Sequence, residues 1–172
     1  MKKAILLLLV VVIALSSFVS AEVNTIFVNQ SQSASDDDSE NYYAVNFTFP
    51  EEKQFGIVTL SHTGDGNDIT LRIHTDNGGV PSTTLAHANA IAHISPGGGH
   101  NIPRNYTFTN GNVTLAAGTY WIKVTRGGSQ RVWGANADYP QSTWLKSGDN
   151  ASWGTVALRN MFFQIWNNTA PI

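Results

Sequence analysis

Apolar and polar residues alternate with a period of two along most of this chain. The alternation is clearest at 43–49, 69–73, 106–108, 120–124 and 161–165. Such alternation is typical of β-strands that bury one face. The stretch 55–60 is more continuously apolar, which favours a central strand. A helical period of 3.6 residues is absent after residue 21.

Clusters of Gly, Asn, Asp and Pro separate the alternating stretches. They lie at 63–68, 76–79, 95–99, 110–111, 127–128 and 148–150. These residue types favour tight turns because they tolerate left-handed backbone or cap it with a side chain. Short strands joined by frequent turns predict an all-β fold, an antiparallel β-sandwich or jelly roll of about eight to ten strands.

The first 21 residues are predicted to be a targeting segment or a membrane anchor. Lys2 and Lys3 precede an apolar run, and small residues follow it up to Ala21. This pattern predicts a secretory signal peptide, and the run is short for a membrane span of ~20 residues. Two alternatives stay open. The segment could remain as an anchor helix, and it is similar to an archaeal type-IV-pilin leader cut between Lys3 and Ala4.

The remaining chain is predicted to form one domain with a short extension at each end. After the signal or anchor segment 1–21, residues 22–40 comprise an N-terminal strand (23–28) and a polar linker. Residues 41–166 form the β-sandwich domain, and 167–172 form a tail. About 150 residues suffice for a hydrophobic core of their own.

Composition supports export and excludes several chemistries. The chain has no cysteine, so disulfide scaffolds and thiol nucleophiles are ruled out. Charged residues are 13% of the chain, against about 25% in typical soluble domains. The formal net charge is −2 and becomes −4 once Lys2 and Lys3 leave with the signal, which argues against a nucleic-acid partner. We therefore expect a secreted, extracellular or cell-surface protein.

Six Asn-x-Ser/Thr sequons predict N-glycosylation. The asparagines lie on the expected solvent face of strands, in loops or in the tail, and they are Asn29, Asn46, Asn105, Asn112, Asn150 and Asn167. The alternative is a β-surface that is rich in Asn and Thr and carries no glycan.

Two stretches carry a resemblance to a known domain type. They are ITLRIHTDNGGVPSTTLA at 69–86 and LAAGTYWIKV at 115–124, and the Ser-Trp-Gly at 152–154 and the strand at 163–165 fit the usual ending. Together they resemble the extracellular jelly-roll domains of prokaryotic surface proteins, of the choice-of-anchor type and more distantly the pre-peptidase C-terminal type. The resemblance implies an extracellular, non-catalytic accessory domain and carries over no active site. It also implies that Trp153 occupies a core position.

Five tryptophans suggest a sugar site. Trp133, Tyr139 and Trp144 lie in one loop-rich stretch with Arg131 and Asp138. Aromatic faces stack on sugars, and a few fixed polar groups complete such a site. The alternative is that these rings plug the open end of the sandwich.

Two further tryptophans fall on the outward phase of their strands. Trp121 and Trp166 alternate with the apolar residues that we expect in the core. The sequence therefore predicts that both rings face away from the core.

The Gly-rich turn at 63–68 offers a candidate calcium site. Asp65, Asn67 and Asp68 supply hard oxygen ligands, and Asp76 and Asn77 do so in the next turn. The alternative is a metal-free turn, because Asn and Asp also cap their own backbone. Apart from this structural calcium, we expect no cofactor.

No motif points to an enzyme. The chain lacks a Gly-x-Ser-x-Gly elbow, a His-Glu-x-x-His pair and a phosphate loop, so no catalytic residue is predicted. A secreted hydrolase is a distant third hypothesis. The leading hypothesis is a secreted or cell-surface glycoprotein that binds glycans or mediates adhesion to cell-surface components.

The alternative hypothesis is a structural subunit that assembles with its own copies. In an extracellular filament, matrix or surface layer, the strand 23–28 would complete a neighbouring subunit's sheet. Contact with a membrane is expected only through the N-terminal segment, if it is not cleaved.

Overall fold

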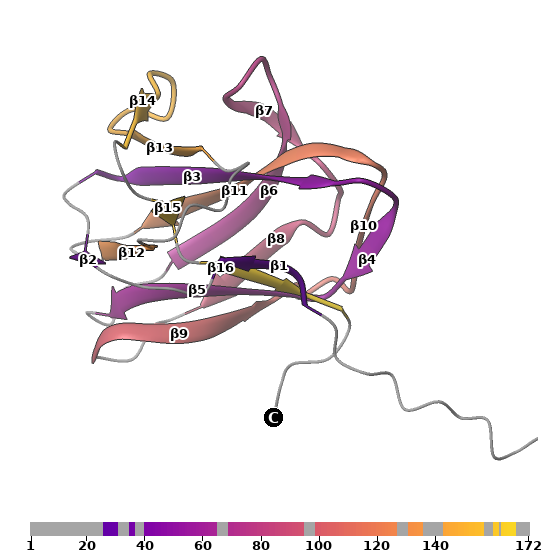
Figure 1. Ribbon diagram of the computed structural model, residues 1–172, viewed down its shortest axis with the longest axis horizontal. Helices are drawn as coiled ribbons and strands as arrows, with labels where there is room; N and C mark the ends of the chain where they lie inside the picture. The colour runs from indigo at the N-terminus through magenta and orange to yellow at the C-terminus, as the bar shows by residue number, and fades with distance from the viewer. Residues whose placement is uncertain are drawn as a thin grey trace, which may run out of the picture.

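The computed structural model describes residues 26–30, 35–36, 40–64, 69–94, 99–126, 131–135, 143–156, 160–161 and 163–167 (Figure 1). At 26, 28–30, 35–36, 62–64, 94, 99–102, 131–135 and 160 it describes the backbone alone. Within these residues every strand pair is antiparallel and no helix occurs, so the predicted all-β class is confirmed.

The described residues form sixteen strands, more than the eight to ten that we expected. Five of them, β2, β4, β10, β14 and β15, are only two or three residues long. An alternating pattern needs about four residues to be recognised, so segments this short leave no signal in the sequence.

The first sheet has seven strands, with β11 near its centre. Its order is β14-β13-β3-β11-β6-β7, and β8 also pairs with β6. In the register of β11, Ile122 pairs with Val45 on one side and Ile73 on the other. The strands are β3 (Tyr42–Phe49), β6 (Ile69–Asp76), β7 (Pro81–Leu85), β8 (Ile91–Ile94), β11 (Gly118–Arg126), β13 (Trp144–Ser147) and β14 (Gly154–Thr155).

The second sheet also has seven strands, and a two-stranded ribbon lies at one side. The order is β1-β16-β5-β12-β15, with β9 paired to β5 and β2 paired to β12. The strands are β1 (Ile26–Gln30), β2 (Ser35–Asp36), β5 (Ile57–Gly64), β9 (Gly99–Thr107), β12 (Arg131–Ala135), β15 (Asn160–Met161) and β16 (Phe163–Trp166), and the ribbon is β4 (Lys53–Phe55) with β10 (Val113–Leu115).

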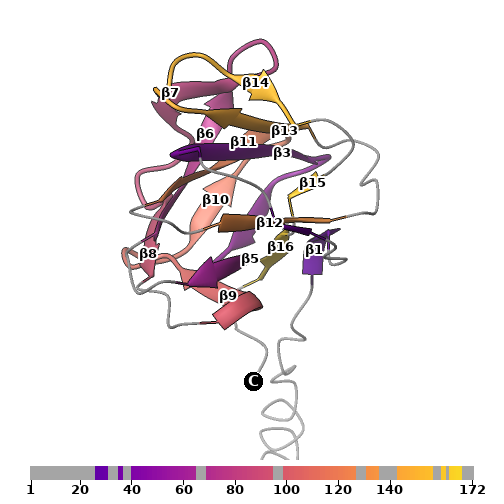
Figure 2. The same cartoon turned by 90° about the vertical axis from the view of Figure 1, so that its left-hand side faces the viewer.

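One core is shared by both sheets. Figures 1 and 2 show β3, β11 and β13 above β5 and β9. Phe47 of the first sheet and Phe163 of the second have ring centroids 6.5 Å apart. Most side chains of the predicted apolar phases are buried here, which confirms those phases: Tyr43, Val45, Phe47, Phe49, Ile69, Leu71, Ile73, Tyr106, Phe108, Ile122, Val124, Met161, Phe163 and Ile165.

The continuously apolar stretch is confirmed as a central strand. β5 pairs with β9 along one edge and with β16 and β12 along the other. Val58 and Leu60 are buried in the core, and Ile57 and Thr59, on the opposite face of the strand, are buried as well. The Thr59 hydroxyl donates to Asn105 Oδ1 at 2.6 Å and accepts from the Trp166 Nε1 at 3.0 Å. This outer-face network satisfies the polar group that β5 buries.

The described part of the N-terminal strand is 26–30, so the strand ends two residues beyond the predicted 23–28, and residues 22–25 lie outside the described part. β1 pairs with β16, and β2 pairs with β12, so the stretch predicted as a separate strand and linker joins the second sheet. The predicted signal segment 1–21 and the end of the predicted tail, 168–172, also lie outside it. Within the described ranges, no helix has the length and apolar character to span a membrane.

Trp121 is buried outside the main core, in a second hydrophobic cluster. Its side chain lies on the outer face of the first sheet, as its phase indicated, but it is 0% exposed. It forms an outer cluster with Ala44 and Leu145, against which Val80 and Trp153 pack. The indole faces no solvent because the chain folds back over this face after β6 and after β13.

Candidate functional site

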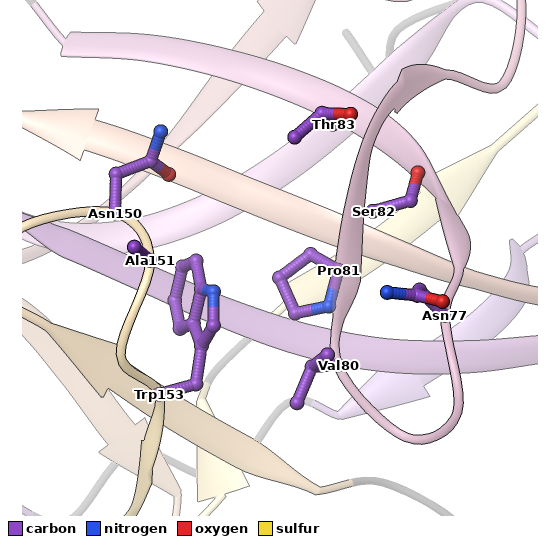
Figure 3. A pocket seen from close by; sticks show the side chains of 8 residues that line it. All are labelled: Asn77, Val80, Pro81, Ser82, Thr83, Asn150, Ala151 and Trp153. Carbon is purple, nitrogen blue, oxygen red and sulfur yellow. The ribbon is translucent and has the colours of Figure 1, made fainter.

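A cavity of about 510 Å³ opens over this outer cluster. It lies between the turn that joins β6 to β7 and the loop that joins β13 to β14 (Figure 3). In Figures 1 and 2 these segments lie on the side of the first sheet that faces away from β5 and β9. The lining residues are Asn77, Val80, Pro81, Ser82, Thr83, Asn150, Ala151 and Trp153.

The β6–β7 turn forms one wall, and its sequence explains its shape. Gly78 and Gly79 have φ angles of 65° and 90°, a region that glycine enters without a steric penalty. The Asp76 carboxylate accepts the Gly79 N–H at 3.2 Å, and the Asn77 N–H donates to the Val80 carbonyl at 2.9 Å. These hydrogen bonds fix the turn in the shape that places Asn77 at the cavity.

The β13–β14 loop forms the other wall and is built around Asp149. Its carboxylate accepts the N–H groups of Ser152 at 2.8 Å and Ala151 at 2.9 Å, and the hydroxyls of Ser147 at 2.9 Å and Ser152 at 3.0 Å. These hydrogen bonds, the two backbone ones above all, hold the pKa of Asp149 well below its usual range. Asn150 has a φ of 64°, and its side chain is exposed beside the cavity.

Both walls are fixed to the same outer cluster. Trp153 from one loop and Val80 from the other pack against the cluster that contains Trp121. The Trp121 Nε1–H donates to Asp76 Oδ1 at 2.7 Å, which ties the base of the β6–β7 turn to β11. Asp76 and Asn77, considered above as calcium ligands, thus have a hydrogen-bonding role in the turn.

The cavity combines an aromatic face with neutral polar groups. Figure 3 shows the half-buried indole of Trp153 on one side, with Val80 and Pro81 opposite, and the amides of Asn77 and Asn150 at its ends. An indole offers a flat apolar face, and amides and hydroxyls offer paired donors and acceptors. This combination suits a polar, uncharged ring such as a sugar.

The prediction that Trp144 contributes to a sugar site is wrong. Trp144 is 1% exposed and lies in the main core, with its ring centroid 6.2 Å from that of Tyr43. Its strand β13 pairs with β3, and the register places Trp144 opposite the core residue Val45. The ring is therefore covered by both sheets.

The other predicted site residues are only partly described. Arg131 and Trp133 lie on β12, for which the backbone alone is described. Tyr139 and Asp138, and the predicted calcium ligands Asp65, Asn67 and Asp68, lie outside the described residues. In the described part of the chain, no three His, Asp or Glu side chains gather at one point where a metal ion could bind.

The sequon asparagines differ in their surroundings. Asn105 and Asn150 are exposed, whereas Asn46, Asn112 and Asn167 are half-buried, and Asn29 lies on β1 with its backbone alone described. Asn46 Oδ1 accepts the backbone N–H of Thr143, which connects β3 to the start of β13. Among the five sequon asparagines whose side chains are described, Asn105 and Asn150 are the most open to a modifying enzyme.

The cavity was missed from the sequence, although both of its turns were recognised there. The residues 77–83 and 150–153 are about seventy positions apart, and nothing in a single sequence places them side by side. Comparison with known proteins adds no guide: no protein-family model, curated protein or solved structure matches this chain.

Proposed function

We propose that this protein is a secreted or cell-surface, non-catalytic carbohydrate-binding domain whose site is the cavity beside Trp153. The observation that carries the proposal is the half-buried indole facing Val80 and Pro81 across a space lined by Asn77, Ser82, Thr83 and Asn150. A sugar would stack one face on the indole and exchange hydrogen bonds with the surrounding amides and hydroxyls.

The finer fold assignment belongs to the same proposal. We infer that the two antiparallel sheets form a jelly-roll sandwich of the choice-of-anchor type, as the stretches 69–86 and 115–124 suggest. That resemblance implies an accessory domain, in which binding loops lie on a rigid sheet scaffold. The cavity has this character, because two loops with internally satisfied hydrogen bonds define it.

The binding test is a glycan array followed by calorimetry on the best neutral sugar. Trp153→Ala should weaken binding at least about tenfold, because it removes the stacking surface. Trp166→Ala is the matched control, since Trp166 is also half-buried but lies on the second sheet. Far-UV circular dichroism would show that both variants keep their β structure. Equal affinity of Trp153→Ala and the wild type would overturn the proposal.

Export and glycosylation complete this proposal. A cleaved segment 1–21 and glycans on Asn105 and Asn150 fit an extracellular protein, and their exposure supports these two sequons. The intact mass of the protein purified from its native host, before and after treatment with a glycosidase, tests both parts. A mass equal to that of the unprocessed, unmodified chain would contradict them.

Assembly through the N-terminal strand is the second candidate function. β1 is the end strand of its sheet and pairs with β16, and Phe27 packs edge-on against Phe49 at 6.2 Å. The same pairing could be made with a neighbouring copy by strand exchange. Electron microscopy and size-exclusion chromatography with and without residues 22–40 test this. Polymers that persist after the deletion, or a wild-type protein that stays monomeric, would count against it.

A further inference from the structure

Two cationic side chains lie side by side on the outer face of the first sheet. Arg72 of β6 is directly opposite Lys123 of β11, in a row that continues through Ala44 to Leu145. Directly opposite residues share a sheet face, with Cβ atoms about 4.5–5.5 Å apart. Lys123 is 7% exposed and Arg72 is half-buried. The sheet thus holds two positive groups close together and largely out of water.

No acidic side chain of the described residues neutralises this cation pair, by which we mean Arg72 and Lys123. The ion pair that joins two described residues, Lys53 and Glu51, lies away from this face, at the two-stranded ribbon. Asp76 shares the face of Arg72, but its carboxylate binds the Trp121 Nε1–H and the Gly79 N–H. Like charges directly opposite are destabilising, and lysine is rarely buried without a partner, so this arrangement requires an explanation.

His74 lies beside the cation pair but does not offset its charge, because the imidazole is neutral near pH 7. It lies between Arg72 and Asp76 on the same face, and it is 4% exposed. Burial, together with the nearby charges of Lys123 and Arg72, lowers its pKa to about 4. Burial likewise lowers the pKa of Lys123, with Arg72 as the second cause.

The cation pair lies on the same outer face as the cavity, one row of residues beyond Trp121 and His74, although neither cation lines the cavity. Trp121 precedes Lys123 by two positions on the same face of β11, a distance of about 7 Å. Trp121 belongs to the outer cluster against which Val80 and Trp153 pack, and these two residues line the cavity. On the other strand, His74 follows Arg72 and lies close to the backbone of Ser82, another lining residue. A ligand that stacks on Trp153 could therefore extend a negative group towards Arg72 and Lys123.

We propose that the ligand is an acidic saccharide, and that Arg72 and Lys123 bind its carboxylate. This inference rests on the proposed carbohydrate-binding function and names the class of sugar. The guanidinium offers two parallel N–H donors that match the two oxygens of a carboxylate, and the ammonium adds a third donor. Charge-assisted hydrogen bonds in a partly desolvated place are stronger than those available to a neutral sugar.

The experiment compares each acidic sugar with its own methyl ester. Oligosaccharides that contain glucuronate, galacturonate or mannuronate are titrated into the purified protein by calorimetry, together with the matching esters. The best acid should bind roughly tenfold or more tightly than its ester, and this advantage should shrink as salt is raised. Lys123→Met and Arg72→Gln should each reduce the advantage while leaving the ester affinity near the wild-type value.

Three controls separate binding from folding. Lys53→Met removes the same charge at the two-stranded ribbon and should retain the preference for the acid. Trp153→Ala should weaken the acid and the ester together. Lys123→Met should unfold at the wild-type temperature or above it, because the ammonium is desolvated beside a like charge.

The outcomes distinguish this inference from the function on which it rests. Equal affinity for acid and ester, or an undiminished acid preference in both cation variants, would overturn the acidic ligand and leave carbohydrate binding intact. Failure of the wild type to bind any acid, ester or neutral sugar would overturn the carbohydrate-binding function and this inference with it.

Discussion

Single polar side chains hold the two walls of the cavity in shape. Asp149 accepts backbone and hydroxyl hydrogen bonds from its own loop, and Asp76 joins its turn to Trp121. Both carboxylates accept hydrogen bonds from their own loop, and Asp76 also accepts one from the Trp121 indole, so each negative charge has hydrogen-bond partners. Near the cavity, His74 and Lys123 are different: they are described side chains whose burial and cationic neighbours lower their pKa values and so disfavour the charged form.

Replacement of His74 should flatten the pH dependence of stability. The pKa of His74 is about 4 in the folded protein and 6.5 in an exposed chain, so the unfolded state binds more protons between these values. The free energy of unfolding should therefore fall as the pH is lowered from about 6.5 to about 4. His74→Leu should reduce this loss, as measured by urea unfolding at several pH values.

His93→Asn is the control for that experiment. His93 is exposed and exchanges a hydrogen bond with the Thr70 hydroxyl at 3.0 Å. A wild-type slope in His74→Leu, or an equal flattening in His93→Asn, would contradict the assignment to His74. Protonation of Asp149 should lower the free energy of unfolding only at more acidic pH, because the pKa of this carboxyl is depressed and its hydrogen bonds are lost only when it is protonated.

Replacement of Trp144 should mainly reduce stability, whereas replacement of Trp153 should mainly weaken sugar binding. Trp144→Ala should lower the free energy of unfolding by about 3–5 kcal/mol, since it leaves a large cavity in the main core. Trp153→Ala removes a half-buried ring and should cost much less stability while it weakens sugar binding. Chemical denaturation and calorimetry measure the two effects. Similar destabilisation by both variants would show that Trp153 is primarily a core residue.

At the scale of elements, the β6–β7 turn depends on glycine for its backbone rather than for space. A Cβ at Gly79 would meet no atom within 4 Å, yet its φ is 90°. Gly79→Ala should therefore destabilise the protein by about 1 kcal/mol through backbone strain and should disturb the cavity wall. The midpoint of thermal unfolding and the affinity for sugar both report the effect.

Gly154→Ala provides the matched control for Gly79. A Cβ at Gly154 also meets open space, but Gly154 has no positive φ and lies in β14. Its replacement should be neutral or slightly stabilising, because alanine restricts the unfolded chain. If the two substitutions had the same effect, the strain argument for the turn would fail.

The elements were predictable where one face of a strand reaches the core. The strands β3, β6, β11 and β16 each alternate because inner residues are buried between the sheets. β14 and β15 were not predictable, because two residues cannot establish a period. β1 continues to Gln30, two residues past its predicted end, and this end is set by pairing with β16 at the far end of the chain.

At the scale of the whole molecule, one core connects the two sheets, so we expect a single unfolding transition. Rings from both sheets are in contact, as for Phe47 with Phe163, and no disulfide is available to a chain without cysteine. Tryptophan fluorescence and far-UV circular dichroism should give coincident denaturation curves. Separate midpoints would show that the sheets unfold independently.

The amino-acid sequence was sufficient to predict an all-β chain without thiols, the strand residues that face the core, and the turns that need glycine or asparagine. Those properties are local, because each depends on a residue and its near neighbours. Which tryptophans are covered depends on the tertiary structure. Trp121 and Trp144 are covered by segments distant in the chain, whereas Trp153 remains half-buried beside a cavity. Burial, and the proximity of Arg72 to Lys123, depend on strand pairing over long separations, which no local pattern encodes.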